Sequence, residues 1–150
     1  MTGFLHLHNF LRWVVLILML LAILKGLSGW LKSKPFSRKD KKIFTFAVAS
    51  LHAQAIIGLV LYFFGPWKQL AEQAALSESA ERFWKMEHIA MMLVATILAT
   101  IGSSKMKRAA TDKAKYKVGA IYFIIALLLI LVSIPWPFYG DVARSLFPGM

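Results

Sequence analysis

Residues 43–67 read IFTFAVASLHAQAIIGLVLYFFGPW and contain no charged side chain. An α-helix rises about 1.5 Å per residue, so about 20 apolar residues cross a hydrocarbon core about 30 Å thick. Residues 118–140, VGAIYFIIALLLILVSIPWPFYG, are uncharged in the same way. Both stretches end in aromatic residues, which is typical of helices that reach the membrane–water interface. These two stretches predict transmembrane helices and so decide the class of the fold.

Two further apolar stretches predict two more spanning helices. Their uncharged parts, residues 13–24 and 89–104, are too short to cross alone. We therefore expect either that polar residues at their outer ends enter the membrane or that the lysine at the inner end of each snorkels to the interface. The four predicted helices cover residues about 9–31, 43–64, 83–104 and 117–138. We predict an all-α integral membrane protein, one domain over residues 1–150, folded as an up-down-up-down four-helix bundle. We also predict a short surface helix within residues 69–81 and unstructured tails at both ends.

The net charge of +11 lies on one side of the predicted bundle. Most basic residues belong to the stretches 25–42 and 105–117, whereas the opposite surface has equal numbers of basic and acidic residues. Basic loops favour the cytoplasmic side. We therefore expect a bacterial inner-membrane protein with both termini outside and basic loops that attract membrane lipids of negative charge. No base-reading element accompanies the charge, so a nucleic-acid partner is not expected.

The sequence resembles one helical hairpin written twice. His8 precedes Lys25 by seventeen residues, and His88 precedes Lys105 by the same number. Each lysine opens a basic stretch that leads into an apolar run ending in Pro-Trp. These matched offsets indicate a tandem repeat of helices 1–2 and 3–4. In such a repeat, His8 and His88 occupy equivalent positions on diagonal helices.

His8 and His88 are the first candidates for chemistry. They lie about 25 Å from the lysines at the inner boundary, near the outer edge of the hydrocarbon. An ionisable group at that depth is a functional candidate by default. Neighbouring axes about 8–10 Å apart give a diagonal of about 11–14 Å, which leaves room for one iron between two imidazoles. The alternative is a pair of interface histidines that bind nothing.

Three other polar residues complete the candidate set. His52 is expected near the midplane, where it needs either a neighbouring backbone or hydroxyl group or a metal or haem. Arg12 follows His8 by four residues and shares its helix face. Its expected partners are Glu87 or the propionates of a haem, and Glu87 alternatively orients an imidazole. Which two of the three histidines pair is left open.

The absence of cysteine excludes disulfides, iron–sulfur clusters, thiolate metal sites and covalently attached haem. The sequence also shows no glycine-rich phosphate loop, no Ser-His-Asp set and no pair of acids in mid-membrane. These absences favour an electron carrier over a stand-alone enzyme. Methionines near His88 are soft ligands, so a copper site remains an alternative.

Four motifs along the chain carry a family resemblance. They are LHNxxRW at 7–13, LHxQxxxGLxLYF at 51–63, EHxxMM at 87–92 and IPWP at 134–137. Together they resemble small bacterial four-helix membrane proteins labelled cytochrome b. The resemblance implies a non-covalent haem b with His8, His52 and His88 as candidate ligands. It also implies electron transfer with a quinol or another redox partner.

Two other functions stay open at this point. Neutral imidazoles also suit copper and zinc, so the same histidines could form a haem-free metal site. A structural accessory subunit of a respiratory membrane complex would need no ligand at all. A homo-oligomer is compatible with each of the three functions.

Overall fold

The structure is a computed structural model that describes residues 2–65 and 77–147. Within these ranges the regular elements are all helical, in the order α1 Thr2–Leu31, α2 Arg38–Phe64, α4 Glu78–Arg82, η1 Phe83–Glu87, α5 His88–Arg108, α6 Asp112–Ser133 and η2 Gly140–Val142. The elements α4, η1 and α5 follow one another without a break. Four helical runs are therefore long and apolar enough to cross a membrane. The prediction of an all-helical chain with four such helices is confirmed.

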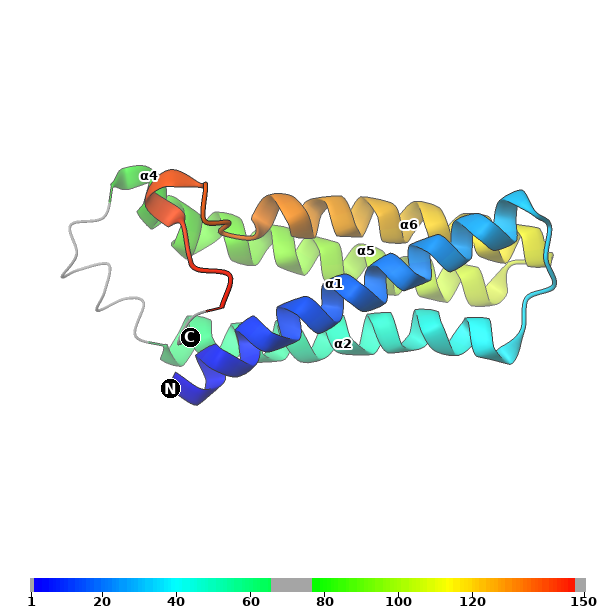
Figure 1. The fold of residues 1–150 in the computed structure, drawn as a ribbon, viewed down its shortest axis with the longest axis horizontal. Helices are drawn as coiled ribbons and strands as arrows, with labels where there is room; N and C mark the ends of the chain where they lie inside the picture. Colours follow the sequence, from blue (N-terminus) through cyan, green and yellow to red (C-terminus); the bar gives the residue numbers. More distant parts are fainter. Residues whose placement is uncertain (1, 66–76, 148–150) are drawn as a thin grey trace.

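The four long helices form a bundle in which each contacts two neighbours. α1 packs against α2 and α6, and α5 packs against the same two helices, so α1 and α5 lie on one diagonal. The loops 32–37 and 109–111 lie at one end of the bundle (Figure 1). The N-terminus and the chain after α6 lie at the other end. This diagonal places the first and third predicted helices opposite each other.

The first helix is longer than predicted, because it begins at Thr2 instead of about residue 9. At about 1.5 Å per residue, Thr2–Leu31 is long enough to cross a bilayer with its polar first turns included. The predicted N-terminal tail is therefore wrong for residues 2 and 3. Residues 66–76 and 148–150, which include most of the predicted surface helix and of the second tail, lie outside the described residues.

The last long helix ends earlier than predicted, at Ser133 instead of about residue 138. Ile134 adopts an extended conformation, with φ −74° and ψ 129°. The cause is Pro135, because a proline disfavours the α-helical region for the residue before it. The chain after Ser133 turns back over the end of the bundle.

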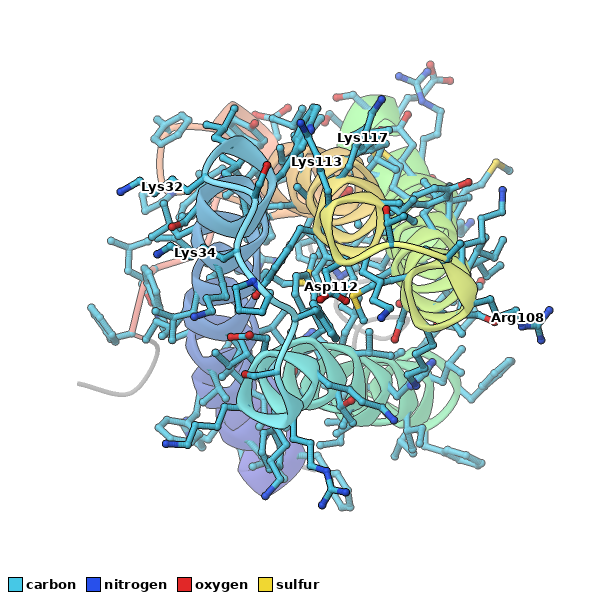
Figure 2. The ribbon with its side chains drawn as sticks, turned by 90° about the vertical axis from the view of Figure 1, so that its right-hand side faces the viewer. Lys32, Lys34, Arg108, Asp112, Lys113 and Lys117 are labelled. Carbon is cyan, nitrogen blue, oxygen red and sulfur yellow. The ribbon has the colours of Figure 1, made fainter. Side chains whose placement is uncertain are left out.

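A buried charge cluster joins α1, α2 and α6 at the end with the short loops. Asp40 is 3 % exposed and accepts a hydrogen bond from the backbone N–H of Ser37, the helix N-cap. The Tyr116 hydroxyl also donates to Asp40, at 2.7 Å, and Lys25 forms an ion pair with it at 2.8 Å. Around this cluster the exposed basic side chains Lys32, Lys34 and Arg108 point away from the bundle axis (Figure 2).

We expect the substitution Asp40→Asn to lower the free energy of unfolding by about 2–3 kcal/mol. The substitution removes the negative charge that pairs with Lys25 and accepts the hydrogen bond from Tyr116. Thermal unfolding of the detergent-solubilised protein measures the effect. Asp112→Asn is the control, since its ion pair with Lys115 is partly exposed and such pairs contribute little. Equal melting temperatures for the two variants would contradict the structural role of Asp40.

Candidate functional site

A cavity of about 490 Å³ lies in the half of the bundle away from the short loops. Its wall comes from all four long helices, from η1 and from the chain after α6, and it is mostly apolar. Its polar members include His8, Asn9, Arg12, Gln54, His88 and Arg144. Small-molecule and cofactor sites usually measure about 300–1,000 Å³ and combine apolar walls with a few polar groups. The cavity has both properties.

The side chains of His8 and His88 meet in this cavity. His8 comes from α1 and His88 is the first residue of α5, and their ring centroids lie 6.5 Å apart with the planes inclined by 68°. Imidazole–metal bonds are about 2 Å long, so two rings that share one ion have centroids about 6 Å apart. The separation in the protein is close to that value, and the structure thus brings together the two residues that the repeat paired.

His88 is oriented by a backbone carbonyl. Its Nδ1 lies 2.8 Å from the carbonyl oxygen of Ser133. A carbonyl only accepts, so Nδ1 carries the hydrogen and Nε2 is left without one, as in most metal-binding histidines. The Ser133 carbonyl is free for this bond because its usual helical partner, four residues on, would be Pro137, which has no N–H.

His8 lies against the facing helix α2. Its backbone carbonyl accepts a hydrogen bond from the Gln54 side chain at 2.9 Å. A Cβ atom added at Gly58 would lie 3.2 Å from Cε1 of His8, so the glycine leaves the room that the ring occupies. The Nδ1 atom of His8 is buried and has no hydrogen-bond partner. A buried polar atom left unpaired is costly, so the site fits a bound group that would bond to this nitrogen.

His52 lies apart from this pair. It is exposed on α2 and does not line the cavity. Its Nε2 lies 3.0 Å from the Thr100 hydroxyl of α5. The structure therefore gives His52 the hydroxyl partner on a neighbouring helix that the sequence offered as one alternative.

Arg12 lines the cavity, but the expected pair with Glu87 is not formed. Arg12 is 8 % exposed and donates from Nη2 to the carbonyl of Leu146 at 2.6 Å. Glu87 instead pairs with Arg82 at 2.6 Å, and no hydrogen bond joins it to an imidazole in the described part of the chain. The reason is geometric, because adjacent residues of a helix face different directions and Glu87 directly precedes His88.

Sequence reasoning missed two contributors to the wall. Trp84 lies four residues before His88, with ring centroids 5.8 Å apart, and the guanidinium of Arg144 lies 4.9 Å from the centroid of the Trp84 ring. Trp84 belongs to the π-helical turn η1, and such turns are frequent at functional sites. No local sequence pattern predicts that Arg144 lines the cavity, because it reaches the cavity only where the chain folds back after Ser133.

No family model, curated protein or solved structure matches the chain. The resemblance to membrane proteins labelled cytochrome b therefore stays a prediction.

Proposed function

We propose that the protein is a membrane-embedded electron carrier that holds one non-covalent haem b between His8 and His88. The observation that carries the proposal is the pair of imidazole rings 6.5 Å apart in a largely apolar cavity. When bound, the haem iron supplies one-electron transfer. The two histidines come from helices on one diagonal, so a shared ligand would also tie the two sides of the bundle together.

The number of available ligands favours haem over a haem-free metal. Within residues 2–65 and 77–147, no group of three or more His, Cys, Asp or Glu side chains could hold a metal ion. Zinc sites use three or four protein ligands. A porphyrin provides four nitrogens of its own, so the imidazoles of His8 and His88 would be enough protein ligands to hold it.

The surrounding residues orient the ligands and place a positive charge near them. The Ser133 carbonyl sets the tautomer of His88. The bond from Gln54 fixes the backbone of α1 at His8. The buried guanidinium of Arg12 places a positive charge at the wall. Burial and nearby charge are the properties by which a protein tunes the reduction potential of a haem.

The orientation in the membrane is part of the proposal. The short loops and their basic side chains would face the cytoplasm, which puts both termini and the cavity on the outer side of a bacterial inner membrane. The bundle would then be an up-down-up-down tandem repeat, with His8 and His88 at one depth. A quinol or a periplasmic carrier is the expected redox partner. The end-on view shows the basic side chains gathered at the loop end (Figure 2).

An absorption spectrum tests the proposal directly. We expect protein purified from membranes, or titrated with haemin, to bind one equivalent and to show a six-coordinate Soret band that shifts on reduction with dithionite. Colourless protein that takes up no haemin would remove the proposal. Stoichiometric copper or zinc in such protein would point to the haem-free metal site instead.

A further inference from the structure

The chain after α6 forms part of the cavity wall, through Ile134, Pro135, Arg144 and Ser145. Residues 140–147, here called the C-terminal strap, run from η2, which contacts α4, towards the first turns of α1 (Figure 1). The backbone N–H of Arg144 donates to the Pro135 carbonyl at 3.0 Å. The Leu146 carbonyl accepts from Arg12. The Phe147 ring stacks on Trp13 with centroids 5.5 Å apart.

Two arginines line this part of the cavity, Arg12 from α1 and Arg144 from the strap, and neither has an acidic partner among the described residues. The ion pairs of the described residues include neither Arg12 nor Arg144. The Nε atom of Arg12 is buried without any hydrogen-bond partner. The Arg144 side chain donates only to the carbonyl of Ala143, its chain neighbour, and lies over the ring of Trp84.

Within residues 2–65 and 77–147, no anion faces the two guanidinium groups. A buried guanidinium without a counter-charge is unfavourable, and the fork of N–H groups matches a carboxylate in two parallel hydrogen bonds. The rest of the wall is mostly apolar. A ligand that satisfies both features is an amphiphile with a flat or bulky apolar body and carboxylates at one end.

We propose that Arg12 and Arg144 form a carboxylate clamp, and that the C-terminal strap closes over the ligand which the clamp holds. This inference rests on the proposed function, since haem b has an apolar ring and two propionates on one edge. Arg12 would hold one carboxylate from α1. Arg144, which belongs to the strap, would supply the positive charge for the second carboxylate.

Arg12 can hold the strap and the ligand at the same time. A guanidinium has five N–H donors, and the hydrogen bond to the Leu146 carbonyl uses only a donor on Nη2. The free Nε–H remains for the ligand. Each carboxylate bound at this end therefore also steadies the residues that fasten the strap, so ligand binding and strap closure reinforce each other.

The experiment compares haemin with its dimethyl ester, in which both propionates are neutral. We expect wild-type protein to bind the ester about 10- to 100-fold more weakly than haemin in a Soret titration. Arg12→Gln and Arg144→Gln are each expected to weaken haemin by about 10-fold and to reduce the difference between the two ligands. Arg144→Lys keeps the charge and is expected to recover part of the loss.

The control is Arg82→Gln. Arg82 lies on the same outer side but pairs with Glu87 and does not line the cavity, so both ligands are expected to bind this variant as they bind the wild type. Circular dichroism and thermal unfolding check that each variant is folded.

A second measurement addresses the strap. Phe147→Ala removes the ring that stacks on Trp13 and is expected to raise the rate of haemin loss to apomyoglobin about 2- to 10-fold. Phe138→Ala is the matched control, because Phe138 is 76 % exposed and lies outside the cavity wall.

The outcomes separate the two proposals. A six-coordinate haemin complex that forms equally well with the ester and in both arginine variants would overturn the clamp and leave the proposed function standing. Equal rates of haemin loss from the two phenylalanine variants would overturn the closing role of the strap. Protein that binds neither haemin nor its ester would remove the proposed function and the clamp together.

Discussion

Replacing His88 with alanine is expected to abolish the six-coordinate spectrum of the haemin-loaded protein and to weaken haemin binding by about 100-fold or more. The imidazole is held in place by the Ser133 carbonyl, and no other described histidine stands ready to replace it. His8→Ala is expected to have the same effect from the other side of the cavity. Soret titrations in the oxidised and reduced states give both the affinity and the coordination number.

His52→Ala is the matched control for these two substitutions. His52 is an imidazole of the same membrane bundle, but it is exposed and lies against Thr100 instead of the cavity. Its loss is expected to leave the spectrum and the haemin affinity unchanged. A spectrum lost in His52→Ala and kept in His8→Ala would show that the ligand pair is assigned wrongly.

The meeting of His8 and His88 could be predicted because it depends on a pattern along the chain. Equal offsets from Lys25 and Lys105 predict one depth for both residues. Because α1 and α5 lie on one diagonal, two inward-facing side chains at the same depth lie close together. No such pattern exists for His52, whose depth can be counted from the basic loop but whose direction around the axis of α2 is decided by packing.

The helix ends were harder to predict, for two different reasons. Polar residues such as His6 and Asn9 lower the hydropathy of the first turns, yet α1 continues through them to Thr2. Inside a membrane a helix satisfies its own backbone groups, so polarity alone does not end it. α6 ends at Ser133 because of Pro135. The prediction extended the helix to about residue 138 because it followed the hydropathy of residues 117–138 instead of this local signal.

The C-terminal strap could not have been predicted from the sequence. Its main fastening is the bond between Arg12 and Leu146, which are 134 residues apart. No sequence motif at either residue predicts this contact. The π-helical turn before His88 is similar, because its register depends on how Phe83 and Trp84 pack against the rest of the site.

Gly58→Leu is expected to prevent haemin binding without unfolding the protein. A Cβ atom at this position would lie 3.2 Å from Cε1 and 3.7 Å from Nδ1 of His8. A leucine adds further carbons to the wall of the cavity and displaces the imidazole, and overpacking of this kind should weaken the complex by about 100-fold. The helix itself should not suffer, since leucine favours the helical conformation more than glycine does.

A size series separates the steric effect from changes in helix stability. Gly58→Ala is expected to give an intermediate loss, because its single methyl group requires His8 to move by only a few tenths of an ångström. Gly3→Leu is the control, since nothing lies within 4 Å of a Cβ at Gly3 and the substitution also replaces a helical glycine with leucine. If Gly58→Leu binds haemin as well as Gly3→Leu does, haemin binding does not depend on the position of the His8 ring against α2. A graded loss from glycine through alanine to leucine, at unchanged melting temperature, would show that it does, as expected of a ligand histidine.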